Sequence, residues 1–236
     1  MYSGGDDDLC LSPFVWRSQL ALKHKNLSFD IEKLTYRQIN STISTITNGQ
    51  WKQVPVLEFP DKTVVYNSLP IAQALEARYE HNPLFPNGTQ LSQFLEHYVN
   101  CHSAYSFFGL ILETEFDTFK PEDQKEAKEK FDGYKRKLSK PKEELYSKAR
   151  EFLKPIEELL KNHKFLEGDK PTYSDYIVFG LLQWLRVMTP VHYKACIEDT
   201  EDQTIRKWFE SILELHGRYA KEFPVNTQYG EFALKV

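Results

Sequence analysis

With 236 residues, the chain is long enough for one large domain or two modest ones, and its 16 Phe and 13 Tyr exclude a disordered sequence. Its formal net charge of −4 at pH 7 provides no basic surface to neutralise phosphates, so nucleic acid is not an expected partner. The sequence has no apolar run long enough for a membrane span, and the acidic stretch from Met1 to Asp8 is unlike a secretory signal, so we expect a cytoplasmic protein.

The first quarter of the chain alternates helix and strand signals. Apolar side chains recur at helical intervals over residues 12–25, which predicts a helix. Alternating apolar side chains over residues 28–34 then predict a short strand. Residues 36–50 are polar and rich in Thr, and they show no clear period.

A β-hairpin and a second helix are predicted next. Residues 54–59 and 63–66 have strand character and are separated by a Pro-Asp-Lys turn. Asn67 or Ser68 can cap the helix that follows directly. Residues 1–80 are therefore predicted to form one unit of mixed helices and strands.

The later part of the chain shows helical patterns without strand signals. Residues 81–89 contain two prolines and a glycine, which predicts a linker between a first domain at 1–80 and a second at 90–236. The expected helical segments are 90–116, the charged stretch 121–162 with breaks or kinks at Pro141 and Pro155, 172–188, and 200–215 opened by a capping box of Thr200 and Gln203.

A hydroxyl stands directly before a proline at the start of the first predicted helix. Pro13 suits the first helical position, so Ser12 would lie at the helix N-terminus. Unpaired N–H groups and the helix dipole favour an anion there, and a thiolate close to Ser12 would be stabilised by both the hydroxyl and the helix. The simpler alternative is that Ser12 only caps the helix.

Two further segments could hold a peptide-like ligand. Pro55 stands at the start of a strand, where Val54 could turn its backbone N–H and C=O outward to pair with an extended ligand. The alternative is an edge strand without a ligand. Asn67 and Ser68 mark a helix start that could receive a carboxylate, or they could form an ordinary cap.

Together these three segments resemble the glutathione-site elements of cytosolic glutathione transferases. A fourth similarity lies at residues 165–175, which resemble the folding capping box of that superfamily, with Thr172 and Asp175 satisfying each other's backbone donors. The resemblance implies an α/β plus all-α fold, with a thioredoxin-like N-terminal domain and an all-helical C-terminal domain. It also implies glutathione as cosubstrate and a homodimer.

Residues 12–17 followed by 21–25 most resemble fungal etherase-related transferases and bacterial β-aryl etherases. This implies that Ser12 stabilises the glutathione thiolate for attack on an apolar, aromatic electrophile, with aryl-ether cleavage as a further option. No metal is expected. The glutathione contacts implied are Ser12, Lys52, Gln53, Val54, Pro55, Asn67 and Ser68, and the expected contacts to the apolar substrate are Phe14, Trp16 and Tyr105.

Three features depart from the family pattern. Only Met1 and Tyr2 precede a Ser-Gly-Gly loop where the family has its first strand, so we expect that strand to be vestigial or trimmed. The carboxylates of residues 6–8 are expected to face solvent, because they would repel an anionic ligand. Asn67 stands where many members carry an acidic residue, which implies different support for the γ-glutamyl end of glutathione.

The sequence also permits functions other than transferase activity. The same scaffold could carry aromatic small molecules without catalysis, or it could act as a regulator. Cys10 could form a mixed disulfide with glutathione, but no basic neighbour lowers its pKa in sequence, which favours a packing or solvent-facing thiol. A glutaredoxin-like reductase would need a cysteine at position 12, where this chain has Ser12.

Overall fold

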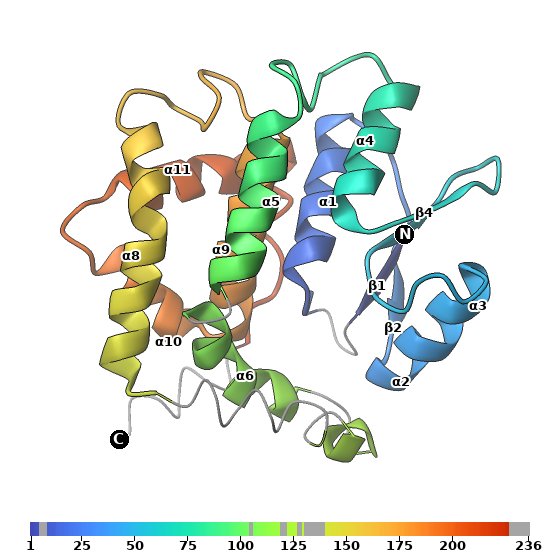
Figure 1. Ribbon diagram of the computed structural model, residues 1–236, viewed down its shortest axis with the longest axis horizontal. Helices are drawn as coiled ribbons and strands as arrows, with labels where there is room; N and C mark the ends of the chain where they lie inside the picture. Colours follow the sequence, from blue (N-terminus) through green and yellow to red (C-terminus); the bar gives the residue numbers. More distant parts are fainter. Residues whose placement is uncertain (5–8, 104–105, 119–121, 127–128, 130–139, 227–236) are drawn as a thin grey trace.

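Figure 1 shows the computed structural model of the chain, which describes residues 1–4, 9–103, 106–118, 122–126, 129 and 140–226. The early residues, in blue and cyan, form a small sheet with helices beside it. The later residues, in green to red, form a larger half made of helices. This arrangement confirms the mixed and all-helical halves expected from the sequence.

Four short strands form the sheet: β1 (Tyr2–Gly4), β2 (Glu32–Leu34), β3 (Val56–Glu58) and β4 (Val64–Tyr66). They are ordered β2-β1-β3-β4, with β1 parallel to β2 and antiparallel to β3. Leu57 pairs with Val65 in the antiparallel hairpin of β3 and β4, which confirms the predicted hairpin. The sheet thus has the mixed topology of a βαβ unit joined to a hairpin.

The first strand is present and is as long as the other three, so it is not vestigial. β1 lies inside the sheet, with Ser3 paired to Lys33 on one side and Tyr2 paired to Val56 on the other. Ser3 and Gly4 therefore belong to a strand and not to a loop. The signal was missed because a strand of three residues that includes Ser and Gly shows no apolar alternation, whereas backbone pairing does not require one.

Helix α1 (Pro13–His24) joins β1 to β2 and lies beside α4 (Ser68–Arg78) and α9 (Tyr173–Met188) (Figure 1). The approach of α9 to the start of α1 is close. A Cβ atom added at Gly180 would lie 2.5 Å from the Pro13 carbonyl oxygen. Only glycine allows this distance, so the helical half directly fixes the N-terminus of α1.

The polar stretch that gave no clear pattern is helical. It comprises α2 (Tyr36–Gln38), a π-helical turn (Ile39–Ile43) and α3 (Ser44–Ile46). Thr35 caps it, and the Gln38 side chain accepts a bond from the Thr35 backbone N–H at 2.9 Å. Its buried Ile43 packs with Leu34 and Val56 of the sheet, and Ile39 and Ile46 pack against the same cluster. These three isoleucines stand at helical spacing, a signal that the polar and Thr-rich composition of the segment obscured.

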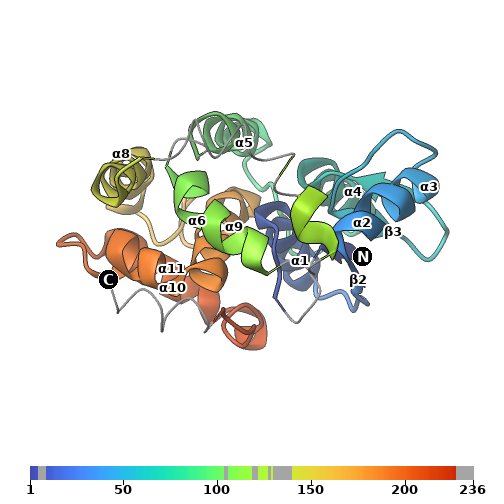
Figure 2. The same cartoon turned by 90° about the horizontal axis from the view of Figure 1, so that it is seen from below.

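The helical half contains α5 (Gln90–His102), α6 (Phe107–Asp117), α8 (Lys142–Leu160), α9, α10 (Pro190–Tyr193) and α11 (Thr204–Leu213). A single helix over 90–116 was expected, but the chain breaks between α5 and α6, which run in different directions (Figure 2). At the break the Ser106 hydroxyl donates to the Ser103 carbonyl at 3.4 Å. Serine hydroxyls compete with helical backbone bonds in this way.

Helix α8 begins directly after Pro141, as the sequence predicted, but it continues through Pro155. Of the break or kink expected at Pro155, the break is absent, because Lys142–Leu160 is one helix. A row of buried apolar side chains on both sides of Pro155, including Phe152, Leu153 and Ile156, holds the helix against the core. Tertiary burial therefore outweighs the backbone hydrogen bond that proline cannot make.

The capping box expected at Thr200 and Gln203 is wrong. Helix α11 begins at Thr204, whose N–H donates to the Asp202 carboxylate at 2.8 Å. The Thr200 hydroxyl donates to the carbonyls of Ile197 and Asp202, so it is directed away from the helix. Thr200 and Gln203 have the spacing of a capping box, but Asp202 lies closer to the first turn of α11 and accepts its N–H instead.

The capping box of Thr172 and Asp175 is present. The Thr172 N–H donates to the Asp175 carboxylate at 2.9 Å, and so do the Leu166 N–H at 2.9 Å and the Trp208 indole N–H at 2.8 Å. Burial raises the pKa of Asp175 to about 6.

Within the described ranges, none of the helices combines the length and apolar character required to cross a membrane.

The segment between the halves is tied to both of them. The ammonium of Lys25 is fully buried and donates to the carbonyls of Tyr79 and His81, at 2.7 and 3.0 Å, and it pairs with Glu76 at 2.5 Å. The Tyr173 N–H of α9 donates to the Leu84 carbonyl at 3.0 Å. These contacts fix how α1 and α4 meet the helical half.

Candidate functional site

Ser12 lies at the N-terminus of α1 with its hydroxyl at the open end of the helix. Its Oγ accepts the Val15 N–H at 3.4 Å, and Pro13 occupies the first helical position, as predicted. No described residue accepts the hydrogen of this hydroxyl, and the first turn carries no acidic side chain. The hydroxyl can therefore donate to an anion while it continues to cap the helix.

The Val54–Pro55 peptide is cis and lies just before β3. Pro55 is buried, and its carbonyl accepts the Asn67 N–H at 3.1 Å, which places this loop beside the start of α4. No described residue bonds to the N–H or C=O of the half-buried Val54. Lys52 and Gln53 are exposed next to it. The backbone of Val54 is thus available to an extended ligand.

Asn67 caps α4 in an unusual backbone conformation. Its φ is 70° and its ψ is 142°, and its side-chain oxygen accepts the Ser68 N–H at 2.8 Å. For a residue other than glycine, such a conformation costs about 1–3 kcal/mol and is found most often at functional sites. The predicted cap is confirmed at Asn67, and this strain marks the loop as a candidate for ligand contact.

Ser68 faces the interior and not the surface. Its side chain has 0% exposure, and its hydroxyl lies 3.5 Å from one carboxylate oxygen of Glu96 in α5. The other oxygen of Glu96 pairs with the buried guanidinium of Arg17 at 2.7 Å. Ser68, expected to contact glutathione, therefore belongs in this structure to a buried polar network beneath the start of α4.

Sequence reasoning missed this buried network. Arg17 and Glu96 join α1, α4 and α5, and the Tyr173 hydroxyl of α9 is close enough that burial, reinforced by Glu96, raises the pKa of Tyr173 far above its ordinary value. A signal was present, because Glu96 stands between the apolar positions Leu95 and Val99 of a helix face. A charge in such a position needs a partner from another element.

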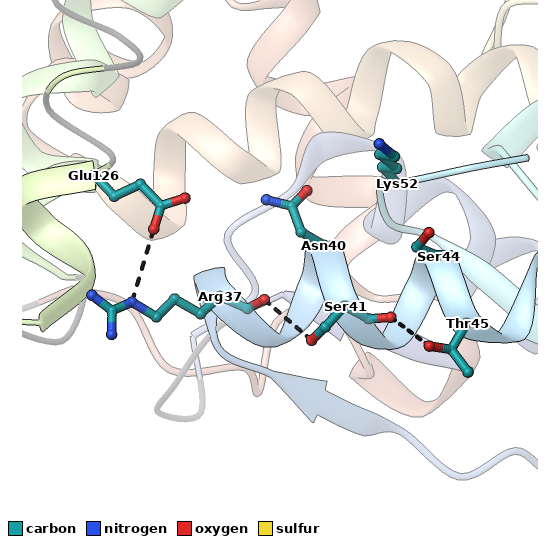
Figure 3. A pocket seen from close by; sticks show the side chains of 7 residues that line it. All are labelled: Arg37, Asn40, Ser41, Ser44, Thr45, Lys52 and Glu126. Carbon is teal, nitrogen blue, oxygen red and sulfur yellow. Dashed lines mark hydrogen bonds and ion pairs between the residues drawn. The ribbon is translucent and has the colours of Figure 1, made fainter. Parts of the chain in front are cut away.

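A polar cavity of about 780 Å³ lies next to Lys52 (Figure 3). It is lined by Arg37, Asn40, Ser41, Ser44, Thr45, Lys52 and Glu126. Asn40 and Ser44 project on the side where Lys52 lies, and Glu126 of the helical half faces Arg37 (Figure 3). Hydroxyl, amide and ammonium groups predominate, so the cavity suits a polar and anionic group.

Arg37 connects the two halves at the edge of this cavity. Its Nε lies 2.9 Å from the buried carboxylate of Asp123 and 3.8 Å from Glu126, and its Nη2 donates to the Glu122 carbonyl at 2.5 Å. These contacts hold α2 against the segment that follows α6. The cavity is therefore bounded by both halves of the molecule.

The aromatic residues expected to contact an apolar substrate have different environments. Phe14 is half-buried, with the Arg17 guanidinium 4.5 Å from its ring centre. Trp16 has 0% exposure and packs edge-on against Phe223 at 4.7 Å, so its position in the core is at odds with a substrate contact. Tyr105 lies outside the described residues.

The remaining candidates also differ in accessibility. Cys10 is buried, and its sulfur lies 3.8 Å from the Ser12 carbonyl oxygen, which favours a packing role. The acidic residues 6–8 lie outside the described residues.

Comparisons with known proteins agree with this architecture. A model of the glutathione S-transferase N-terminal domain matches residues 11–78, and a model of the glutathione S-transferase C-terminal domain matches residues 93–215. The second model alone matches more than half of the chain.

Solved structures of similar fold include several from fungi. The glutathione transferase GSTFuA3 from Phanerochaete chrysosporium is 23% identical, with 98% of this chain and 94% of that chain covered and a TM-score of 0.67. The glutathione S-transferase CsGST63524 of Ceriporiopsis subvermispora, in complex with glutathione, is 19% identical, with 92% and 96% covered and a TM-score of 0.74. Gtt2 from Saccharomyces cerevisiae is 16% identical, with 93% and 100% covered and a TM-score of 0.61. The resemblance found in the sequence is confirmed: the chain belongs to the glutathione S-transferase family, whose substrate is glutathione.

Proposed function

We propose that this chain is a serine-type glutathione transferase in which Ser12 donates a hydrogen bond to the sulfur of bound glutathione. The position of Ser12 carries this proposal. Its hydroxyl lies at the start of α1, it caps the helix through its oxygen, and its hydrogen has no acceptor among the described residues. A thiolate bound there gains both the hydroxyl and the helix N-terminus.

The Ser12 hydroxyl and the N-terminus of α1 can together supply the free energy needed to ionise the thiol of bound glutathione at pH 7. A thiol with a pKa of about 8.5 is only about 3% ionised at pH 7, and lowering the pKa by about two units makes the thiolate the major form. That shift requires about 2.7 kcal/mol. One hydrogen bond to a charged group supplies about 1.5–3 kcal/mol, and a helix N-terminus adds about 0.3–1 kcal/mol.

The rest of glutathione would extend across the loop that precedes β3. The backbone N–H and C=O of Val54 would pair with the cysteinyl unit, because an extended peptide bonds to an open strand edge in this way. Asn67 would support the γ-glutamyl end through its amide. Lys52, beside Gln53 and at the polar cavity of Figure 3, would attract the glycyl carboxylate. The Ceriporiopsis structure, which holds glutathione, supports glutathione as the ligand of this fold.

The thiolate would attack an apolar, aromatic electrophile. A sulfur–carbon bond forms, and the leaving group departs with the bonding electrons. The half-buried Phe14, two residues from Ser12 in the sequence, would contact the second substrate. Aryl-ether cleavage is the second candidate reaction, supported by the similarity of residues 12–17 and 21–25 to etherase-related enzymes. A phenolate would then leave and take a proton from water.

Steady-state kinetics with a chromogenic aryl halide and a model aryl ether test this proposal. We expect turnover of at least one of them, with Ser12→Ala lowering kcat by about 100-fold, the effect of losing one hydrogen bond to a developing charge. Ser18→Ala, a change from serine to alanine on the same helix, is the matched control and should retain activity.

Two outcomes would contradict the proposal. Unchanged turnover in Ser12→Ala would mean that Ser12 does not stabilise the thiolate, and Cys10 would be the next candidate. Tight binding of aromatic fluorophores without turnover of either substrate would support the alternative of a carrier. Ser12→Cys is expected to shift activity toward thiol exchange, because the protein itself would then supply the nucleophile.

We also propose that the protein is a cytoplasmic homodimer. Phe94 of α5 is 61% exposed and stacks on Tyr98, which provides an apolar side chain for a partner subunit. Sedimentation velocity should show a dimer that Phe94→Asp weakens. A wild-type monomer at micromolar concentration would contradict the assignment.

A further inference from the structure

A cavity of about 610 Å³ lies in the helical half, and it shares no lining residue with the polar cavity of Figure 3. Its walls come from α9, α10, the π-helical turn Lys194–Glu198, α11 and the segment after α11. Among the described residues that line it, six carry charged side chains and only Leu213 is apolar. Its volume is that of a small-molecule site, and its lining suits a charged ligand and not an apolar one.

Helix α11 turns a polar face toward this cavity. Lys207, Glu210, Ser211 and Glu214 stand three or four residues apart, so they lie on one side of the helix. The other side of α11 is apolar and buried in the core. The position of these charges is therefore fixed by the packing of the helix.

Half of the six charges are already paired. Arg206 Nε lies 2.8 Å from the Glu210 carboxylate. The Glu214 carboxylate pairs with the Lys221 ammonium and lies 3.4 Å from Arg218 Nε. Glu210, Glu214 and Lys221 are thus neutralised without a ligand.

The other three charged groups, Arg186, Lys207 and Glu198, have no ion-pair partner in the part of the chain that the structure describes. Arg186 is half-buried and donates one long hydrogen bond, at 3.4 Å, to the Gln183 side-chain oxygen. Burial lowers the pKa of Arg186 against opposing contributions from Tyr193 and Glu198, so its positive charge is only partly compensated. A bound anion would complete that compensation.

The Tyr193 hydroxyl supplies a neutral polar group beside these charges. Tyr193 is 5% exposed and lines the cavity, and none of the described side chains bonds to its hydroxyl. Burial, reinforced by Glu198, raises the pKa of Tyr193 well above its ordinary value, so the hydroxyl keeps its hydrogen. The hydroxyl can therefore donate to an anion held by Arg186.

We propose that this cavity binds an acidic α-amino acid, which carries two carboxylates and one ammonium group. The three unpaired groups of the cavity have two positive charges and one negative charge, and this ligand has the complementary set. Its α-carboxylate would bond to Arg186 and Tyr193. Its ammonium group would pair with Glu198, and its second carboxylate would pair with Lys207.

The charge set also separates this ligand from its nearest analogues. A dicarboxylate without an ammonium group would place a like charge against Glu198. An amino acid with a neutral side chain would leave Lys207 unpaired. The γ-glutamyl group of glutathione has the same α-carboxylate and ammonium groups, so an acidic amino acid could also enter the glutathione site, and the experiment must distinguish the two sites.

The test is isothermal titration of the full chain with L-glutamate, repeated in the presence of S-hexylglutathione. We expect one L-glutamate per chain and the same affinity in both titrations, because S-hexylglutathione fills the glutathione site and not this cavity. Failure of S-hexylglutathione itself to bind would contradict the proposed function, whereas the binding of L-glutamate would still be measured.

Two analogues test the charge set. L-glutamine should bind about 3- to 5-fold more weakly than L-glutamate, which is the effect of losing one exposed ion pair. Glutarate should bind at least about 10-fold more weakly, because a hydrogen-bonded charge is lost at Glu198.

Variants assign the binding to this cavity. Lys207 is exposed, so Lys207→Gln should fold normally, bind L-glutamate about 3- to 5-fold more weakly and leave L-glutamine unchanged. Lys52→Gln makes the same change at the cavity of Figure 3 and should leave the binding of both ligands unchanged. Glu198→Gln should lower the preference for L-glutamate over glutarate.

The proposal is overturned if L-glutamate does not bind, or if S-hexylglutathione displaces it. It is also overturned if Lys207→Gln binds L-glutamate as tightly as the wild type, or if Lys52→Gln weakens the binding as much as Lys207→Gln does.

Discussion

Two residues of the same helix have separate tasks. Ser12 offers its hydroxyl at the open end of α1, whereas Arg17 is fully buried and pairs with Glu96. Two nitrogens of Arg17, Nε and Nη2, have no partner among the described residues, so its charge depends chiefly on Glu96. A buried ion pair adds little net stability, but the loss of one partner leaves a costly unpaired charge.

Glu96→Ala should therefore destabilise the protein by about 3–5 kcal/mol. The double variant Arg17→Met with Glu96→Leu should recover most of this loss, because apolar side chains of similar volume replace both charges. Urea unfolding measures the free energies of unfolding of the wild type, Glu96→Ala, the single variants Arg17→Met and Glu96→Leu, and the double variant. A double variant as unstable as the sum of the two single variants would contradict the pairing.

A second residue-scale feature makes stability depend on pH. The Tyr176 hydroxyl lies 2.7 Å from Nδ1 of His24 and 3.0 Å from Nε2 of His216. Burial, with further contributions from His24 and Lys23, lowers the pKa of His216 to about 4. His216 and the next two residues, Gly217 and Arg218, all have positive φ, so this contact holds a strained turn.

The sign of the pH dependence follows from the lowered pKa. Below about pH 6.5 the unfolded chain takes up the proton that folded His216 resists, so stability falls as the pH decreases toward about 4. His216→Asn should lower the proton uptake on unfolding between pH 6.5 and 4.5 by up to about one proton. Unfolding free energies measured across this range check the prediction, and parallel curves for wild type and variant would contradict it.

At the scale of elements, the closest contact is between α1 and α9. Gly180→Ala would place a methyl group 2.5 Å from the Pro13 carbonyl oxygen, a backbone atom that cannot rotate away. We expect a loss of about 1–3 kcal/mol, the usual effect of overpacking, together with lower transferase activity because the start of α1 shifts. Thermal unfolding and kinetics measure both effects. Gln73→Ala, at an exposed helical position, is the control, and Gly180→Ala with wild-type stability and activity would contradict the tight contact.

The elements also show what the sequence could predict. Helix α9 was predicted nearly to the residue because fifteen of its sixteen residues are buried and its capping box precedes it. The continuation of α8 through Pro155 and the separation of α5 from α6 were not predicted. Neither outcome follows from local helix propensity. Contacts with other elements decide the first case, and the bond from the Ser106 hydroxyl to the Ser103 carbonyl marks the second.

At the scale of the whole molecule, the local structure at the proposed glutathione site was partly predictable from the sequence. Ser12, Val54 and Asn67 lie at helix starts and a strand start, which are local features with recognisable signals. The inward position of Ser68 and the network of Arg17 and Glu96 could not be predicted. They depend on how the two halves pack, and no single segment encodes that packing.

If Ser12 stabilises a glutathione thiolate, the thiol pKa of bound glutathione must be lowered. This pKa is the most direct measurement of the role proposed for Ser12. An ultraviolet difference titration of the wild-type complex should give a thiol pKa about two units below the free value of about 8.5. In Ser12→Ala the pKa should return by at least about one unit toward the free value. The same pKa in both proteins, or a wild-type pKa equal to that of free glutathione, would contradict the account.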